Sequence, residues 1–428
     1  MILITRHDAL AGTTTGRVVA VVTALLLSSA APARVSGQDW PQWRGPTRDG
    51  VVPPAATPAA WPTSFEPSWT LEIGEGYASP IVANGHAFTI SRQDPREVVT
   101  AVDLGDGSVI WRQSYEAAFE KNPYAVTMAK GPNATPLFAD GRLFTVGVSG
   151  IVAAWSADDG TALWRHDFSD IFDSSVLFCG TAASPVLANG LVILQVGSDV
   201  HGSRVVALDP VDGEIRWTWE GPGPGYASPA LIEIGGTAHV VTTTEQSIVG
   251  LDPSTGGELW SIPFPDEWHE NIVTPVWTGT ALLMSGNRQG THAYRGRENA
   301  DGWRWTEAWV NPDVTLYMST PVLADGLLFG LSSKRRGQFV ALDVTSGAIA
   351  WSSEGREGEH AAALLTRDHV VFLTNGAELT VARRDGTTFD IEHSYQVAES
   401  ETWAVPVLLS DDILIRDDVS LIRLTPGG

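Results

Sequence analysis

The chain has 428 residues and a formal net charge of −23, from 50 acidic and 27 basic residues. Such an acidic protein repels phosphate backbones and anionic lipid headgroups, so neither nucleic acid nor an anionic membrane is an expected partner. The single cysteine, Cys179, excludes an internal disulfide, and 43 glycines with 26 prolines favour a turn-rich β fold.

Residues 1–37 are typical of a secretory signal peptide. Arg6 and Arg17 precede an apolar run over residues 18–31, and small residues lie just before Gln38. The run is too short for a membrane span, and no cysteine near its end could carry a lipid anchor. We therefore expect a periplasmic or secreted protein with no membrane span and no lipid anchor.

Residues 38–67 form a segment rich in proline and tryptophan, which we call the N-terminal arm. Its prolines exclude regular secondary structure, whereas Trp40, Trp43 and Trp61 indicate that it docks on the rest of the protein. The expected docking place is either the side of the following domain or one end of its central channel.

From residue 78 onward, the chain repeats a unit that starts with a small residue, a proline and a short apolar run. The restart prolines from Pro80 to Pro321 are 56, 49, 44, 46 and 46 residues apart, and the last gap, to Pro406, is 85 residues. Each unit contains four β-forming runs separated by Gly, Asp and Asn turns, which predicts a four-stranded antiparallel sheet. Such repeats close into a ring of blades, a β-propeller.

The ends of the chain set the number of blades. A weaker unit over residues 361–395 fills the double-length gap, and the last unit, residues 404–424, has room for only three strands. An orphan strand over residues 68–74 precedes the first unit. Pairing it with the C-terminal blade predicts an all-β, eight-bladed propeller over residues 68–428. A seven-bladed ring, with 361–395 as an excursion, is the alternative.

Most units end in a turn followed by a tryptophan, as in ALDPVDGEIRW over residues 207–217. At the end of an outer strand, a large ring can pack on the next blade and donate its indole N–H to the adjacent turn. We therefore assign a structural, blade-docking role to Trp69, Trp111, Trp164, Trp217, Trp260 and Trp351.

The A-[ST]-P-[ILV] restarts and the A-L-D-x-x-[ST]-G-x-x-x-W endings resemble the repeat of two groups of proteins. One group is the alcohol dehydrogenases that depend on pyrroloquinoline quinone (PQQ), and the other is the non-enzymatic propeller lipoprotein that assists outer-membrane protein assembly. The opening DWPQWRGPTRDGV is also similar to the start of many exported bacterial proteins with this repeat. The resemblance implies a propeller of the cell envelope.

The resemblance implies two different functions, and the sequence departs from both patterns. The dehydrogenases carry a vicinal cysteine pair, a calcium ion held by Glu, Asn and Asp, and an Asp base, whereas this chain has one cysteine. The lipoprotein carries a lipid-bearing cysteine, which is missing here. PQQ and calcium are therefore possible cofactors that no motif places, and no catalytic residue can be assigned.

A site in such a ring is expected where the loops before each restart converge on one mouth of the channel. Aromatic, acidic and imidazole side chains there could stack on a planar ligand, bind a cation or hold an extended peptide. Repetition alone would also explain them, as it does the pentapeptide GYASP at residues 76–80 and 225–229. The ligand-binding candidates are Tyr77, Lys130, Asn133, Thr181, Tyr226, His269, Glu270, Asn271, Tyr317, Glu359, His360, Glu401 and Trp403.

The sequence thus predicts a monomeric binding or scaffolding module of the envelope, acting without catalysis. Its expected partner is an envelope protein or a small planar ligand. The alternative function is a PQQ- and calcium-dependent oxidoreductase, similar to an alcohol dehydrogenase, with its site at the channel mouth. A metal held by His269 and His360 is a minor alternative, and no metal site is predicted.

Overall fold

The structure is a computed structural model that describes residues 39–120, 122, 125, 129–171, 179–198, 200–384 and 388–427. The predicted signal peptide, residues 1–37, lies outside the described residues. Within the described ranges, no helix combines the length and the apolar character that a membrane crossing requires.

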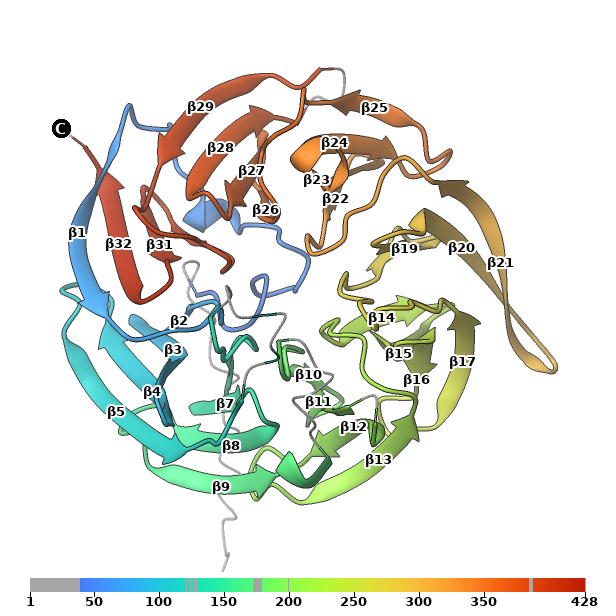
Figure 1. The fold of residues 1–428 in the computed structure, drawn as a ribbon, viewed down its shortest axis with the longest axis horizontal. Coiled ribbons are helices and arrows are strands. Elements are labelled where there is room, and N and C mark those ends of the chain that lie inside the picture. The colour runs from blue at the N-terminus through green and yellow to red at the C-terminus, as the bar shows by residue number, and fades with distance from the viewer. Residues whose placement is uncertain are drawn as a thin grey trace, which may run out of the picture. The chain divides into compact units, whose positions relative to one another are not determined.

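The described chain forms eight four-stranded antiparallel sheets, which are the blades of one ring (Figure 1). This confirms the predicted eight-bladed β-propeller. Blades 1 to 4 contain β2 (Ile81–Ala83), β3 (His86–Gln93), β4 (Arg96–Asp103), β5 (Val109–Glu116), β6 (Leu137–Ala139), β7 (Arg142–Val146), β8 (Ile151–Ser156), β9 (Ala162–Asp167), β10 (Val186–Ala188), β11 (Leu191–Ser198), β12 (Gly202–Leu208), β13 (Ile215–Gly221), β14 (Ala230–Ile234), β15 (Thr237–Thr243), β16 (Ser247–Leu251) and β17 (Glu258–Pro263).

Blades 5 to 8 complete the ring, and in the described ranges three short 3₁₀ helices lie in its loops and in the arm. These blades contain β18 (Val276–Trp277), β19 (Leu282–Gly286), β20 (Gly290–Asn299), β21 (Gly302–Asn311), β22 (Val322–Ala324), β23 (Leu327–Ser332), β24 (Gln338–Asp343), β25 (Ile349–Ser352), β26 (Ala361–Leu365), β27 (His369–Thr374), β28 (Glu378–Arg383), β29 (Ile391–Gln396), β30 (Val407–Leu409), β31 (Asp412–Arg416), β32 (Ser420–Pro426) and β1 (Phe65–Glu72). The 3₁₀ helices are η1 (Pro54–Ala56), η3 (Ser169–Ile171) and η4 (Lys334–Arg336).

The ring closes through the two ends of the propeller, as predicted. Strand β1 pairs with β32 in antiparallel register, with Thr70 opposite Ile422, so the last sheet has the order β1-β32-β31-β30. The closing strand begins at Phe65 and ends at Glu72, slightly earlier than the expected residues 68–74. The weak repeat over 361–395 forms the complete blade β26–β29, which excludes the seven-bladed alternative.

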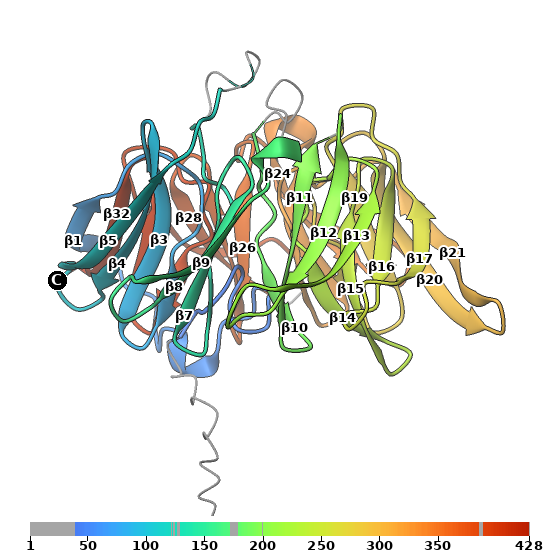
Figure 2. The same ribbon diagram turned by 90° about the horizontal axis from the view of Figure 1, so that it is seen from below.

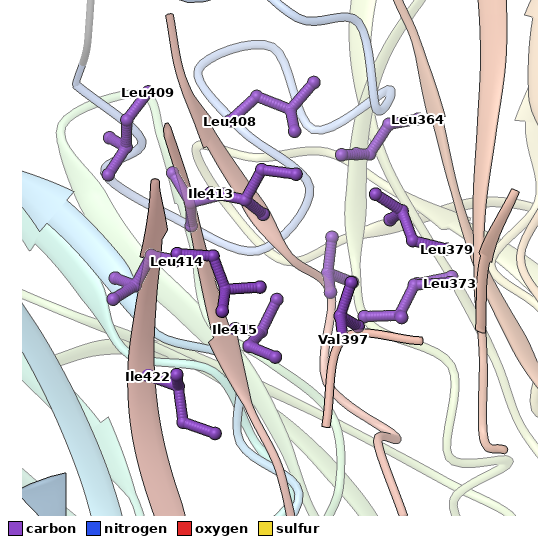
Figure 3. Close-up of a cluster of buried hydrophobic side chains, with 14 of the residues drawn as sticks. Leu364, Leu373, Leu379, Val397, Leu408, Leu409, Ile413, Leu414, Ile415 and Ile422 are labelled. Carbon is purple, nitrogen blue, oxygen red and sulfur yellow. The ribbon is translucent and has the colours of Figure 1, made fainter. Parts of the chain in front are cut away.

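The hydrophobic core is divided among the interfaces between blades, because each sheet buries apolar side chains on both faces. Figure 3 shows one such cluster, in which Leu364, Leu373 and Leu379 of blade 7 pack near Leu408 and Ile413 of blade 8. The arm adds three residues to this cluster, Trp40, Val52 and Ala56. The arm is therefore part of the folded core.

Four of the six tryptophans named above dock on the next blade in the expected way. Their indole N–H groups donate to turn carbonyls at 2.9–3.2 Å, and each ring lies against a turn glycine whose Cβ would leave it no room. The pairs of tryptophan and carbonyl are Trp69 with Leu104, Trp111 with Ala157, Trp164 with Pro210 and Trp217 with Pro253.

Trp260 and Trp351 differ from this pattern because blades 5 and 7 lack the short D-x-x-x-G turn. Trp260 donates within its own blade, to His239 Nδ1 at 2.8 Å, and its ring lies 4.6 Å from that of Trp305. The indole nitrogen of Trp351 is buried and has no hydrogen-bond partner in the part of the chain that the structure describes, and its ring stacks on Phe389. Trp309 takes the docking role that the sequence analysis missed, donating to the carbonyl of Val344 at 3.0 Å.

Candidate functional site

The N-terminal arm crosses one end of the ring. In Figure 1 the blue arm runs through the middle of the ring of blades, and in Figure 2 it lies at one face while the short η3 and η4 coils lie at the other. Of the two docking places expected from the sequence, the structure has the end of the channel. The arm therefore closes this end of the channel.

Hydrogen bonds tie the arm to seven of the eight blades. Its main chain bonds to blades 1, 2, 7 and 8, and two arginine side chains bond to the starts of the innermost strands of blades 3, 4 and 6. The acceptors and donors on the blades are Val82, Phe138, Pro185, Pro229, Pro321, Leu365 and Ser410. The expectation that the arm has no regular structure is wrong at η1 (Pro54–Ala56), where Pro54 begins a 3₁₀ turn. The bonds to the blades hold the arm across the end of the ring.

The motif WRGPTRDG forms the centre of this closure. Arg44 donates to the carbonyls of Pro321 and Asp49, and Arg48 donates to those of Pro185 and Pro229 at 2.7 and 2.8 Å. Both guanidinium groups lie 5.5 Å from the ring of Trp43. Burial lowers the pKa of Arg44 to about 10 and that of Arg48 to about 9, so both remain charged at neutral pH.

A cavity of about 230 Å³ lies on the other side of the arm, with Trp43 and Arg44 in its lining. Residues from the loops that precede the innermost strands of all eight blades form its wall. Seven of the thirteen candidate residues line it, namely Tyr77, Asn133, Tyr226, Glu270, Tyr317, His360 and Trp403. That these residues bind a ligand stays a prediction.

Three rings form a stack on one side of the cavity. The ring of Trp403 lies 5.3 Å from His360 at an interplanar angle of 14°, and 5.3 Å from Tyr77 at 31°. The Trp403 indole N–H donates to Glu401 at 2.8 Å, and the Tyr77 hydroxyl accepts from the Ala129 amide at 2.9 Å. These bonds fix the orientation of both rings, and burial raises the pKa of Tyr77 to about 12.

A carboxylate and a phenol in the cavity lining, Glu270 and Tyr317, are hydrogen-bonded to each other. Burial raises the pKa of Glu270, and its hydrogen bonds from Tyr317 and from Asn287 at 3.1 Å partly offset this. Burial, followed by the charge of Glu270, raises the pKa of Tyr317. Tyr317 is therefore a neutral donor to Glu270 at neutral pH.

The duplicated pentapeptide GYASP takes two different conformations. In the first copy Gly76 has a φ of 127°, whereas in the second Tyr226 itself has a φ of 71°. A left-handed backbone at a tyrosine is sterically unfavourable, so the surrounding loops must impose it. Tyr77 and Tyr226 therefore both reach the cavity, but the backbone of the two identical pentapeptides differs.

Six candidate residues lie outside the cavity lining. Lys130 pairs with Asp94, and the His269 Nδ1 lies 2.5 Å from the Glu245 carboxylate. Asn271 is buried and donates to the carbonyls of Thr244 and Phe264, which is a structural role. Thr181 is buried beside the cavity wall, and both Glu359 and Glu401 are exposed.

The sequence analysis missed a belt of hydroxyl groups around the channel. At five of the restarts, the Ser or Thr that precedes the proline accepts a hydrogen bond from the backbone amide of the equivalent residue in the preceding blade, whereas Thr274 donates its hydroxyl to the Ser228 carbonyl at 3.2 Å. The donor and acceptor pairs are Val405 with Ser79, Ser79 with Thr135, Thr135 with Ser184, Ser184 with Ser228 and Thr274 with Thr320. The repeated [ST]-P dipeptide was the available signal, and all five of these hydroxyl side chains line the cavity.

Comparison with known proteins places the chain in a family. A family model described as outer membrane protein assembly factor BamB matches residues 95–353, which is more than half of the chain. The chain belongs to this family. BamB of Yersinia pestis is 24% identical over 233 residues, which make up 51% of this chain and 56% of that protein. The chain thus spans about half the length of this curated relative.

Two solved structures share the fold. Quinohemoprotein alcohol dehydrogenase from Comamonas testosteroni has a TM-score of 0.67 at 14% identity, covering 91% of this chain and 81% of that chain. BamB from Moraxella catarrhalis has a TM-score of 0.60 at 14% identity, covering 84% of this chain and 97% of that chain. At these identities the likeness shows the architecture alone.

The residues of the cavity do not fit PQQ with calcium. Glu270 is the only acidic residue in the lining, and no group of three His, Cys, Asp or Glu side chains in the described part of the chain could hold a metal ion. Cys179 lines the cavity without a second cysteine beside it. His269, bound to Glu245, is not in the lining with His360.

The half-buried imidazole of His360 predicts a specific acid sensitivity. Burial lowers its pKa to about 4, although the carbonyls of Met318 and Trp403 partly oppose this shift. As the pH falls below the ordinary value of 6.5, the unfolded chain binds a proton at this residue before the folded protein does. The His360 contribution to stability is therefore present above pH 6.5 and is lost as the pH falls toward 4.

The matched variant for this prediction is His360→Phe, which keeps a ring against Trp403 but cannot be protonated. Denaturant unfolding of both proteins at pH 7 and pH 4.5 measures the effect. We expect acidification to destabilise the wild type more than the variant. An equal loss in both proteins would show that His360 does not cause it.

Proposed function

We propose that the protein is a non-catalytic binding and scaffolding module of the cell envelope. The observation that carries the proposal is the cavity at the centre of the ring. Every blade contributes residues to it, and the protein's own arm closes it at one end. Its walls are mostly aromatic and hydroxyl side chains whose positions hydrogen bonds fix, as in a site prepared for binding. Membership of a family named after an assembly factor supports the same function.

The proposal includes the location and the kind of partner. The signal-peptide pattern of residues 1–37 supports export to the periplasm or beyond, where we place the propeller as a monomer. The partner is an envelope protein or a small ligand that enters the open mouth. The relatives named BamB support an envelope protein as the partner.

Site-specific photo-crosslinking in living cells tests this function. A photoreactive residue at Glu359, an exposed position next to the cavity-lining His360, reports contacts at the mouth. The control position is Glu116 on the outer strand β5, where the side chain is 83% exposed. We expect an adduct with one envelope protein, identified by mass spectrometry, from position 359 and not from position 116.

Two results would contradict the proposal. Equal adducts from the two positions, or none from either, would show that the mouth is not a contact surface. Reduction of an electron-accepting dye by the purified protein with an alcohol, PQQ and calcium would show that the protein is an oxidoreductase.

A further inference from the structure

The chemistry of the cavity wall selects a class of ligand. We propose that the cavity binds a compact organic cation whose charged group carries N–H donors, such as an ammonium group on a small apolar body. This inference rests on the proposed binding function and specifies its ligand. Aromatic faces, one anchored carboxylate, one acceptor without a partner and an acidic rim support it.

The lining contains five aromatic residues besides His360, which are Trp43, Tyr77, Tyr226, Tyr317 and Trp403. The face of an aromatic ring carries partial negative charge and attracts a cation, most strongly where water is displaced. An apolar body of the ligand is also accommodated, because rings cover much of the wall. The cavity volume of about 230 Å³ limits the ligand to a small molecule.

Glu270 supplies the opposite charge. It is the only carboxylate in the described lining, and the donors Tyr317 and Asn287 hold it in place. Each carboxylate oxygen can accept more than one hydrogen bond, so these donors leave capacity for a ligand. An ammonium group would form a charge-assisted hydrogen bond with it, which is stronger than a neutral one.

Asn133 provides an acceptor that the protein does not use. Its amide nitrogen donates to the Cys179 carbonyl at 2.8 Å, which fixes the side-chain orientation. Its Oδ1 atom is buried with no hydrogen-bond partner among the described residues, and the residue lines the cavity. Leaving a buried acceptor unpaired is unfavourable, so an N–H donor of the ligand would satisfy it.

The rim near Tyr77 is negatively charged. Burial raises the pKa of Asp418, and the nearby carboxylates of Glu401, Asp417 and Glu75 raise it further. Such a group of like charges attracts a cation toward the mouth and repels anions. The rim does not define the site, but it agrees in sign with Glu270 inside it.

Three arginines oppose this charge. Arg288 acts on Glu270 without lining the cavity and lies 5.4 Å from the ring of Trp268, and the other two already have hydrogen-bond partners. Arg44 donates to the carbonyls of Pro321 and Asp49, and the Asp49 carboxylate partly balances its charge. Arg416 lies buried behind the Tyr77 loop and donates to backbone carbonyls of blade 1. Neither guanidinium therefore presents an uncommitted charge for an anionic ligand.

Three probes of the same shape test the ligand class by calorimetric titration of the mature protein. Benzylammonium carries the charge and the N–H donors, benzyl alcohol is its neutral counterpart and benzoate is its anionic counterpart. We expect benzylammonium to bind at least about tenfold more tightly than benzyl alcohol. Benzoate should not bind detectably.

Tetramethylammonium separates the charge from the donors. It can make cation–π contacts but cannot donate to Glu270 or Asn133, so it should bind more weakly than benzylammonium. Glucose tests a neutral ligand rich in hydroxyl groups and should not bind. Equal or tighter binding of benzyl alcohol, benzoate or glucose would overturn the proposal, as would the absence of benzylammonium binding.

Two variants locate the site. Glu270→Gln and Trp403→Ala should each weaken benzylammonium binding by about tenfold, whereas Glu116→Gln on the outer strand β5 should leave it unchanged. Thermal unfolding checks that each variant is folded. Unchanged affinity in folded Glu270→Gln would place the cation elsewhere and overturn the assignment.

The outcomes also separate this inference from the proposed function. If no cation binds but position 359 still cross-links to one envelope protein, the binding module stands and the ligand class is wrong. If benzylammonium binds in the cavity and no envelope protein is captured, the ligand class stands and the scaffolding role is wrong.

Discussion

Truncating Trp40 to alanine is expected to lower the free energy of unfolding by about 3–5 kcal/mol. Trp40 lies in the arm, is only 1% exposed, and packs in the core cluster that joins blades 7 and 8. Its backbone pairs in both directions with Val82 of blade 1, at 2.7 and 3.0 Å. The loss comes from the cavity that the indole leaves, because the rigid blades around it cannot collapse to fill the space.

The control for Trp40→Ala is Trp268→Ala, because Trp268 is 60% exposed and its removal should change stability by less than about 0.5 kcal/mol. Guanidinium unfolding followed by circular dichroism measures both variants. Equal midpoints for Trp40→Ala and the wild type would show that the arm is not part of the core. In that case the part of the cavity wall that Trp43 and Arg44 of the arm form would also be loosely packed.

The architecture was predictable because the repeat itself carries it. Restart prolines at nearly constant spacing give the number of sheets, and the orphan strand before Pro80 gives the closure. The exceptions lie where a blade departs from the repeat. In blade 5 the ten-residue strands β20 and β21 extend past the point where other blades have the short turn that accepts the tryptophan N–H. Trp260 therefore donates to His239.

The site was only partly predictable because loop conformation decides which side chains face the channel. His269 and Glu270 are neighbours in sequence, yet Glu270 lines the cavity while His269 turns to Glu245. The left-handed φ of 60° at His269 produces this separation, and the repeat pattern of the sequence does not predict such a backbone angle. The arm residues Trp43 and Arg44 were missed because no period relates them to the blades that they contact.

Replacing Arg416 by methionine is expected to destabilise the protein by about 3 kcal/mol or more. The side chain is 1% exposed at the end of β31 and donates to the carbonyls of Ala78 and Ile90 at 2.8 Å and of Glu75 at 3.0 Å. Methionine fills similar space but removes these three donated bonds. The Glu75 carbonyl keeps the Arg92 amide as a donor at 2.8 Å, and each buried carbonyl that is left unpaired costs about 1–3 kcal/mol.

Two variants control this prediction. Arg367→Met removes an arginine whose side chain is 87% exposed and should leave stability within about 0.5 kcal/mol of the wild type. Arg416→Lys keeps the charge, but an ammonium group has only three donors and lacks the planar spread of a guanidinium. We expect it to recover a small part of the loss. Full recovery by lysine would show that charge, and not the set of hydrogen bonds, stabilises this position.

The position of Arg416 links ring closure to the cavity. Its acceptors lie in blade 1 and in the segment that leads from the closing strand β1 to Tyr77. Gly76 lies in the same segment and packs closely on Arg416. A Cβ atom at this position would collide with the Arg416 guanidinium and with the backbone of Pro132. In folded Arg416→Met, Tyr77 should therefore lose its fixed place against Trp403, and benzylammonium affinity should fall although Arg416 is not in the cavity lining. An unchanged affinity would show that the cavity wall keeps its shape without this tie between the last blade and the first.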